Sequence, residues 1–461
     1  MNCRGGLDPA RRAAFNENML HQSTAIRTNS LTMMPILNMR GFISALLVAS
    51  AATLCTSAVA RAADPAPVAP DPVRAAFFDD ATFTLHVRNY LFDRTNNPGD
   101  DPAAWAIGGW VGYQTGWIGD FLRLGAVAYT SQPLWAPEDR AGSLLLLPDQ
   151  DGFSVLGQAY AALRYEGQVL TLGRQMVHQP EINPHDNRMV PITYEGGSLG
   201  GDVGMLSYYA AFLTATKTRG SNEFDNFGEV VGVDQDEPMY LGGLALAPSD
   251  DIKARTSLYV VPDILLSSYS DGQWNMGEHN GFSFELSSQF MIQTGIGSEL
   301  LTGPDFTAWV FGIMGDVSRD GLTLTAGYTA NGSDDDWQTP YGMWPGYTNM
   351  IIGVFDRAGE QTLLLGAAYD LGHVGIDGLT LSTLVAIDTH VAEDLPMWSE
   401  YDFIASYDLS AIDSLPHWLS PLSLNAQYAL LQSDDPDGDS NLSDELRLIL
   451  NYELKSTGKD L

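Results

Sequence analysis

Residues 171–197, TLGRQMVHQPEINPHDNRMVPITYEGG, interrupt a chain that otherwise alternates between polar and apolar residues. A short alternating strand, 169–175, leads into this segment, and the next alternating stretch begins after Gly201. A segment of this length without a regular period is usually functional or disordered. Its prolines, apolar residues and tyrosine favour a folded loop over a disordered one. We therefore predict that a loop, 176–200, folds inward between two strands and narrows a barrel.

Alternation with a period of two residues dominates the chain after residue 80. In the first such stretch, Phe83, Leu85 and Val87 face one way, and His86 and Arg88 face the other. Segments of about ten residues with one apolar and one polar face are typical of transmembrane β-barrels. Strands of soluble sandwiches are usually shorter, about five or six residues. We count roughly 16–18 strands and predict an all-β antiparallel transmembrane barrel. Other clear examples are 252–260, 282–290, 322–329, 422–428 and 446–452; the pattern is weaker over 203–216, 306–316 and 379–388.

An apolar stretch near the start of the chain has the length of a secretory signal peptide. It spans 42–55, follows Arg40, and precedes Ala60 and Ala62, which form a small-x-small cleavage site. This stretch is too short, and too rich in Ala and Ser, for a membrane-spanning helix. We expect export to the outer membrane of a Gram-negative bacterium. The expected divisions are an N-terminal extension with cleaved signal peptide (1–62), a tether (63–80) and the barrel (81–455).

Cysteine content and charge exclude several classes of protein. Cys3 and Cys55 both lie in the segment expected to be removed, so the exported chain has no disulfide. The formal net charge of −34 excludes electrostatic binding of nucleic acid. Acidic residues gather between strands, as in 334–336 and 434–445, where they form a solvated surface or bind lipopolysaccharide through divalent cations. The spacing in 434–445 does not match a calcium-binding EF-hand loop, and we expect no cofactor and no metal site.

Several motifs resemble those of the OprD family of outer-membrane porins. They are RNYLFDR (88–94), GRQ (173–175), NPHDNRMVP (183–191) and TYEGG (193–197), with DELRLILNYEL (444–454) as a final strand. In length and strand rhythm the resemblance covers essentially the whole mature chain. It implies a monomeric barrel of 18 strands that passes small carboxylate-bearing solutes along a row of arginines. Two features depart from the family: Tyr194 replaces a common Phe, and residues 455–461 continue past the last strand.

Basic residues lie on the polar faces of the strands. An arginine that faces lipid at the midplane costs roughly 2–4 kcal/mol, so we expect these side chains to line the lumen. Fixed charges in a narrow passage select the sign of the permeating ion. We predict a basic track for amino acids and organic or aromatic acids, formed by Arg88, Arg123, Arg164, Arg174, Arg188, Lys253, Arg255 and Arg447. Arg174 and Arg188 join this set through the family motif; Arg174 shares the side of Leu172 unless it lies beyond the strand end. The expected constriction-loop residues are His178, Pro180, His185, Asp186, Pro191 and Tyr194.

Other interpretations of these residues stay open. Any water-filled lumen needs polar side chains, so a general diffusion pore is the main alternative. His178, His185, Asp186 and Ser198 contain the residue types of a hydrolytic triad, but no nucleophile motif surrounds Ser198. The histidine spacing matches no zinc signature. Adhesion through the acidic loops is the third alternative. We expect no enzymatic activity; the expected partners are outer-membrane lipid and lipopolysaccharide, small solutes and the barrel-assembly machinery, for a monomer.

Overall fold

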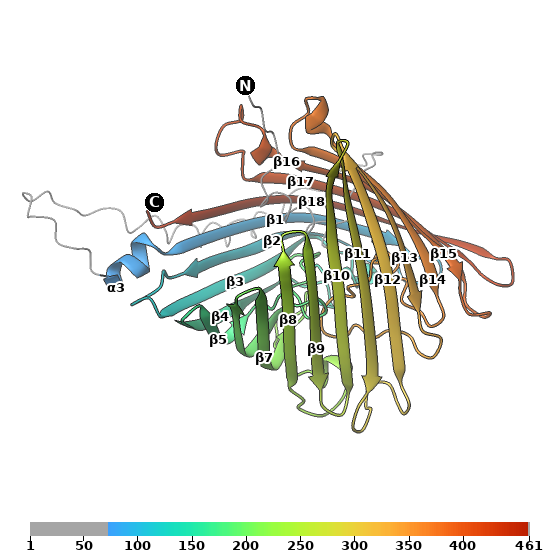
Figure 1. Ribbon diagram of the computed structural model, residues 1–461, viewed down its shortest axis with the longest axis horizontal. Helices are drawn as coiled ribbons and strands as arrows, with labels where there is room; N and C mark the ends of the chain where they lie inside the picture. Colours follow the sequence, from blue (N-terminus) through green and yellow to red (C-terminus); the bar gives the residue numbers. More distant parts are fainter. Residues whose placement is uncertain (1–71, 460–461) are drawn as a thin grey trace, which may run out of the picture.

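The computed structural model describes residues 72–459. The predicted extension and signal peptide, 1–62, and the start of the tether lie outside the described residues. The described part of the tether is helical, with α3 (Pro72–Arg74) followed by η2 (Ala75–Asp79). The Tyr113 hydroxyl donates a 2.6 Å hydrogen bond to the Phe77 carbonyl, and Lys459 pairs with Asp80 at 2.5 Å. The helical segment therefore lies beside the end of the last strand (Figure 1).

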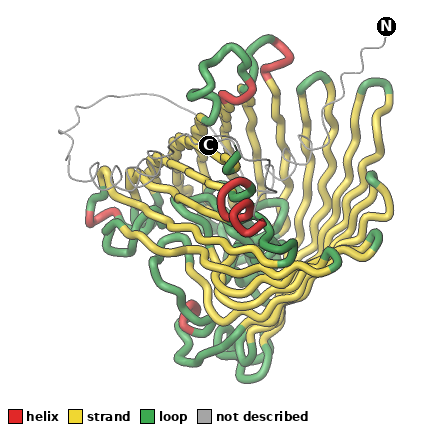
Figure 2. Tube along the Cα trace, turned by 90° about the vertical axis from the view of Figure 1, so that its left-hand side faces the viewer, coloured by secondary structure: helices red, strands yellow, loops and turns green. Residues whose placement is uncertain are grey.

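Eighteen antiparallel strands form one closed sheet, as predicted (Figures 1 and 2). The strands are β1 (Thr82–Thr95), β2 (Ala103–Gln114), β3 (Leu122–Trp135), β4 (Phe153–Tyr165), β5 (Gln168–Gln175), β6 (Thr193–Val203), β7 (Leu206–Lys217), β8 (Met239–Ser249), β9 (Ile252–Val261), β10 (Leu265–His279), β11 (Phe282–Gly295), β12 (Thr307–Arg319), β13 (Leu322–Asn331), β14 (Gln361–Asp370), β15 (Leu379–His390), β16 (Met397–Asp408), β17 (Leu422–Asp434) and β18 (Ser440–Thr457). Each strand pairs with its sequence neighbours, and β1 pairs with β18 to close the ring. Closure removes sheet edges, which lipid cannot satisfy.

The two faces of the sheet differ as the alternation predicts. On β9, Leu258 is 43% exposed on the outer face, whereas Ser257 and Tyr259 are 4% and 3% exposed and face the lumen. The same arrangement recurs on β14, where Leu365 is 47% exposed and Leu364 only 4%. Apolar side chains on the outer face thus form a belt for lipid, and the inner face carries polar side chains together with apolar ones, such as Leu364, that pack against the loops.

The two ends of the barrel carry connections of different length. At the end where β1 begins and β18 ends, several turns have two residues, such as Asn280 and Gly281 between β10 and β11. Both residues have positive φ, 54° and 81°, the geometry that an Asn-Gly hairpin turn provides. Short turns face the periplasm and long loops face outward in barrels of this kind. The long loops are 136–152, 176–192, 218–238 and 332–360, which we name L2, L3, L4 and L7.

The remaining helical segments are single turns. They are η3 (Glu138–Arg140) in L2, η4 (Glu229–Val231) in L4, η5 (Leu371–Val374) and η6 (Leu409–Ala411). Within residues 72–459, no helix has the length and apolar character to span a membrane.

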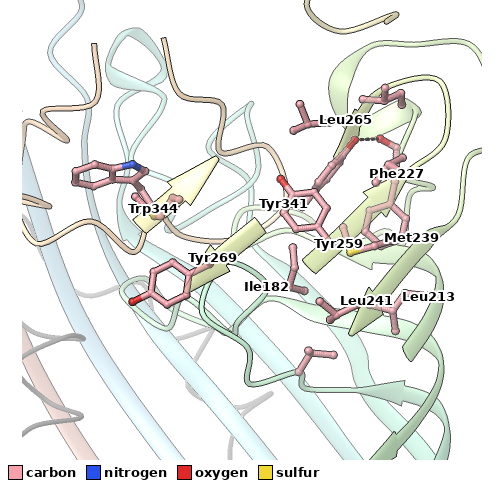
Figure 3. Packing of buried hydrophobic residues seen from close by; sticks show 14 of the residues in the cluster. Ile182, Leu213, Phe227, Met239, Leu241, Tyr259, Leu265, Tyr269, Tyr341 and Trp344 are labelled. Atoms are coloured by element: carbon pink, nitrogen blue, oxygen red, sulfur yellow. Dashed lines mark hydrogen bonds between the residues drawn. The ribbon is translucent and has the colours of Figure 1, made fainter. Parts of the chain in front are cut away.

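The apolar core lies inside the barrel, where the long loops pack against the wall. In the larger cluster, Ile182 of L3 and Tyr341 of L7 pack with Tyr259 of β9 (Figure 3). A second cluster joins L2 and L3 to β1 through Tyr90, Phe92, Leu145, Leu146, Met189 and Val190. L3 contributes to both clusters, so it is a folded element of the lumen, as its apolar residues predict.

The inward loop is shorter than predicted. It ends at residue 192, because β6 begins at Thr193, whereas the sequence prediction extended the loop to residue 200. Four glycines within β6 hide its alternation, since glycine has no side chain to indicate a face. Gly196 is also required sterically: its φ is 151°, and a Cβ there would lie 2.2 Å from the Phe212 carbonyl oxygen. Tyr194 therefore belongs to a strand rather than to the loop.

The orientation of β14 gives the first prediction. Leu365→Arg should lower the free energy of unfolding by about 2–4 kcal/mol, because it places a guanidinium in the middle of the lipid-facing belt. Leu365→Ala is the matched control, since it removes the same apolar contacts without adding charge. Denaturant titration in lipid vesicles measures the difference. Equal stabilities for the two variants would mean that this face does not contact lipid.

Candidate functional site

Loop L3 crosses the lumen and is attached at opposite walls. β1 and β10 lie opposite each other in the ring, because eight strands separate them on either side. At β10, the Ser267 hydroxyl donates a hydrogen bond to the Glu181 carboxyl group. At β1, Arg88 forms a 2.7 Å ion pair with Asp186. L3 therefore spans the interior and reduces the passage through the barrel.

Arg88 joins L3 to the seam between the first and last strands. Its Nη2 lies 3.2 Å from Asp186 Oδ2, and its Nε donates to Asn451 Oδ1 of β18 at 2.8 Å. Nη1 also donates to the Arg188 carbonyl. The guanidinium lies 5.6 Å from the centre of the Trp110 ring, and the whole residue is 7% exposed. Most donors of Arg88 are thus engaged in holding the loop.

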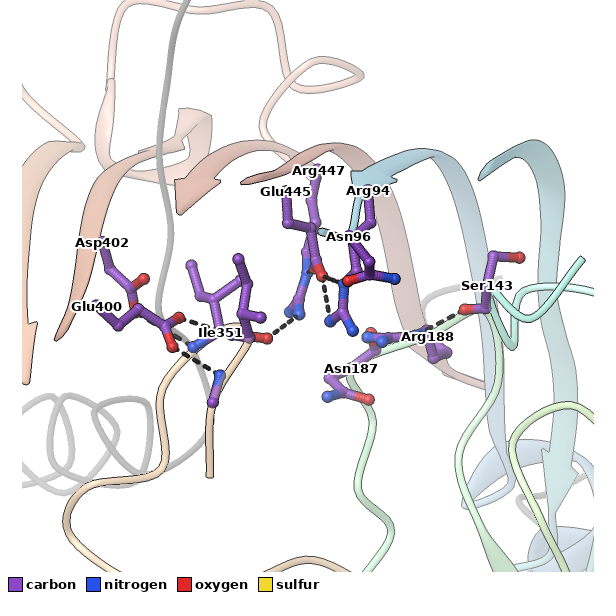
Figure 4. A network of polar contacts seen from close by, with 12 residues as sticks. Arg94, Asn96, Ser143, Asn187, Arg188, Ile351, Glu400, Asp402, Glu445 and Arg447 are labelled. Carbon is purple, nitrogen blue, oxygen red and sulfur yellow. Dashed lines mark hydrogen bonds and ion pairs between the residues drawn. The ribbon is translucent and has the colours of Figure 1, made fainter. Parts of the chain in front are cut away.

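Two further arginines approach the same wall from the strands. Arg94 of β1 and Arg447 of β18 both pair with Glu445, whose side chain is fully buried (Figure 4). Arg94 lies six residues after Arg88 on β1 and therefore on the same face of the strand. The alternation of faces along 88–94 could have identified it as a lumen residue. One carboxylate is shared by these two guanidinium groups.

Two more arginines reach this region from the loops. Arg188 of L3 donates from Nε to the Ser143 carbonyl of L2 at 2.9 Å. Arg219 of L4 lies 3.3 Å, Nη1 to Nε2, from His185. The sequence prediction missed Arg219, because it lies beyond the end of β7 and no period extends into L4. We call Arg88, Arg94, Arg188, Arg219 and Arg447 the arginine cluster.

The arginine cluster has a surplus of positive charge. Its carboxylate partners are Asp186 and Glu445, and within residues 72–459 neither Arg188 nor Arg219 forms an ion pair. Burial and then repulsion by Arg447 lower the pKa of Arg188 to about 10. Burial and then the neighbouring cluster arginines lower the pKa of Arg219 to about 9. Both groups remain charged at neutral pH, and an anion beside them would relieve the repulsion.

Loop L7 is attached on the other side of the cluster. The peptide N–H groups of 351–353 donate to the buried carboxyl groups of Glu400 and Asp402 over 2.6–3.3 Å (Figure 4). The Ile351 carbonyl accepts a 2.8 Å hydrogen bond from Arg447. L7 is therefore held between β16 and the arginine cluster, and it narrows the lumen together with L3.

The other predicted track residues lie in separate parts of the wall. Near the periplasmic end, the guanidinium carbons of Arg123 and Arg164 are 4.3 and 4.4 Å from the centre of the Trp117 ring. On β9, Arg255 faces the lumen and pairs with Asp271 of β10. Lys253 has the same parity as Arg255. Six of the predicted track residues thus lie on strands and face the lumen: Arg88, Arg123, Arg164, Lys253, Arg255 and Arg447.

Arg174 does not belong to the lumen wall. It lies opposite Glu195 in the register of β5 and β6 and pairs with it at 2.8 Å. Leu172, on the same face, is 47% exposed to the outside. The prediction that Arg174 lines the solute pathway is wrong, because β5 continues to Gln175 and the parity of the strand is kept.

The predicted loop residues differ in environment. Asp186 is exposed but paired, and the His185 ring Nδ1 lies 3.0 Å from the Gly342 carbonyl of L7. Burial, and then the nearby Arg219, hold the pKa of His185 well below its usual range. His178 is exposed, Pro180 is half-buried and Pro191 is buried. His185 and Asp186 are thus engaged in holding L3.

The residue types considered for a hydrolase have other partners. The Ser198 hydroxyl donates to Gln175 Oε1 at 2.6 Å, and Asp186 pairs with Arg88. Within residues 72–459, the structure contains no group of three or more His, Cys, Asp or Glu side chains suited to hold a metal ion.

A family model decides the relationship of the chain to known proteins. Residues 75–456 match the model for "outer membrane porin, OprD family". The chain belongs to the OprD family of outer membrane porins. No curated protein matches the chain. Family membership places this β-barrel porin in the outer membrane of a Gram-negative bacterium. Porins of the OprD family are channels for small solutes, not enzymes.

Solved structures of the family share the fold. OccK9 (OpdG) of Pseudomonas aeruginosa has a TM-score of 0.74 and 24% identity, covering 83% of this chain and 100% of that protein. OpdK of the same species, solved with vanillate, has a TM-score of 0.73 and 20% identity over 82% of this chain and 100% of its own. A BenF-like porin from Pseudomonas fluorescens Pf-5 gives 0.71 and 19%, with the same coverage.

The crossing of L3 gives the second prediction. Deleting residues 179–187 removes the Glu181 and Asp186 side chains that attach L3 to opposite walls. Single-channel conductance should rise several-fold, because a wide barrel is otherwise an aqueous channel. Planar-bilayer recording measures this change. Heat-modifiable migration on a detergent gel is the control for a folded barrel. If a folded deletion variant keeps the original conductance, L3 does not limit the flow of ions through the barrel.

Proposed function

We propose that this porin allows passive, substrate-selective diffusion of small carboxylate-bearing solutes, such as amino acids and organic or aromatic acids. The surplus positive charge of the arginine cluster carries the proposal, because it lies where L3 and L7 narrow the passage. Within residues 72–459, the guanidinium groups of Arg188 and Arg219 form no ion pair with a carboxylate, so their charge is left for a solute. Fixed charge at a constriction selects the sign of the permeant directly.

Guanidinium chemistry supports carboxylates as the selected anions. A guanidinium presents a planar fork of donors that matches the two oxygens of a carboxylate, whereas a neutral sugar cannot use its charge. The Arg123 and Arg164 side chains near the periplasmic end supply a later contact for the same anion. OpdK, solved with vanillate, is consistent with this class of solute.

The net charge of −34 does not oppose this proposal. Charges of exposed loops are screened beyond about 8–10 Å at physiological salt. The arginine cluster is partly buried, so its charge is screened less. The sign at the constriction therefore governs selection, even though the sign of the whole chain is opposite.

A general diffusion pore is the second candidate. The observation that favours it is the pairing of charge on the wall of β9 and β10, where Arg255 and Asp271 neutralise each other. If paired charges serve only to keep the lumen hydrated, solutes of equal size should diffuse through the barrel at equal rates.

The proposal also includes the partners of the barrel. We propose that the barrel works as a monomer. In support, the constriction is complete within one chain, since L3 and L7 attach to the wall of their own barrel. The apolar belt contacts outer-membrane lipid, the acidic outer loops contact lipopolysaccharide, and the barrel-assembly machinery inserts the chain.

Solute uptake gives the third prediction. Arg188→Gln/Arg219→Gln should reduce the uptake of benzoate-like acids at least about fivefold, since an attraction of roughly 1 kcal/mol is expected for a charge pair at 4 Å even in water. Uptake of neutral sugars should be unchanged. Liposome swelling compares both solute classes, and Arg174→Gln on the outer face is the matched control. Equal rates for all solutes, in wild type and variant, would reduce the protein to a general pore.

A further inference from the structure

Glu181 is a buried carboxyl group at the point where L3 meets β10. The residue is 6% exposed, and Oε1 accepts a hydrogen bond from the Ser267 hydroxyl. Its second oxygen, Oε2, is buried and has no hydrogen-bond partner in the structure. It lines a cavity of about 10 Å³ between L3 and L7, beside Tyr259 and Tyr341. A space of that size holds about one water molecule.

The surroundings of Glu181 do not supply a positive charge. The titratable groups that face it are tyrosines: Tyr259 from β9, Tyr269 from β10 and Tyr341 from L7. The charged pair on these strands, Arg255 and Asp271, is satisfied within itself. Among residues 72–459, no Lys or Arg forms an ion pair with Glu181. An unpaired carboxylate in such a place is strongly unfavourable, so the group is a neutral acid.

Contacts between L3 and L7 surround this acid. The Met343 N–H donates to the Glu181 carbonyl at 3.3 Å, and a Cβ on Gly342 would lie only 1.9 Å from that carbonyl oxygen. The Tyr194 hydroxyl lies 2.8 Å from the Tyr341 carbonyl and 3.1 Å from the Asn183 carbonyl. This close backbone packing restricts the access of water to Glu181.

We propose that the neutral Glu181 side chain is the positioning residue that seats L3 between β10 and L7, so that a single buried proton fixes the width of the passage. Loss of the proton would place an unpaired negative charge among the tyrosines. The cavity beside Glu181 holds only about one water molecule, so full hydration of that charge requires L3 to leave the wall at β10. The attachments of L3 at β1, among them Arg88 with Asp186, stay in place, so the loop swings about the β1 side.

The direction of the pH effect follows from the surroundings. Burial raises the pKa of Glu181 to about 8, and the hydrogen bond from Ser267 partly opposes the increase. The position of L3 against β10 and L7 is therefore stable at pH 7 and below. L3 leaves this position as pH rises through about 8. The effect concerns pore width, so it rests on the channel activity alone and not on the proposed preference for carboxylates.

Swelling of proteoliposomes with a neutral trisaccharide tests the proposal. In the wild type, the rate should rise at least about twofold between pH 6.5 and 9, with a midpoint near 8, because a wider passage admits larger solutes. Glu181→Gln keeps the size and neutrality of the acid, and its rate should stay low over the whole range. Ser267→Ala removes the hydrogen bond that lowers the pKa, so its midpoint should move to higher pH.

Two results would overturn the proposal. One is a wild-type rate that does not change with pH; the other is a step of the same size and midpoint in Glu181→Gln. A neutral solute separates this test from the proposed carboxylate preference, since the charge of the arginine cluster does not act on it. Heat-modifiable migration at each pH verifies that the barrel stays folded.

Discussion

Backbone that leaves the strand ladder inside the barrel needs new hydrogen-bond partners, and this requirement organises the lumen. L3 and L7 cannot remain in the interior with their peptide groups unpaired, because each buried unpaired group costs about 1–3 kcal/mol. Side chains of the wall supply the partners: Glu400 and Asp402 accept from three successive N–H groups of L7, and Arg88 and Arg447 donate to carbonyls of L3 and L7. Arg88 and Arg447, which the sequence predicts as contacts for solutes, thus also hold the loops in place.

Much of the fold follows from the sequence, because lipid outside and water inside impose a period of two residues. That period predicts the faces of β1, β9 and β18, and the family motif adds the number of strands. It fails where side chains are missing, as in glycine-rich β6. It was misapplied at Arg174, where the motif was preferred to the parity of the strand.

The candidate site is less accessible to sequence reasoning, since loops have no period. Asp186 and Arg188 were identified through the motif, but their partners were not. Arg219 and Glu181 lie in loops, and only the packing of L3 against L4 and β10 gives them a role. Glu181 in particular looks like an ordinary acidic loop residue until its burial is known. Local charge is equally hard to predict, since the net charge of −34 gives no indication of a cluster of five arginines.

The position of Arg88 connects the constriction with the assembly of the barrel. Arg88 and Asn451 are register partners on the first and last strands, and the same guanidinium holds Asp186. The attachment of L3 is therefore complete only when the N-terminal and C-terminal strands have met. A barrel that has inserted but not sealed its seam lacks one of the bonds that orient Arg88. The narrow passage is in this way a product of ring closure, and an unfinished barrel has no fully ordered constriction.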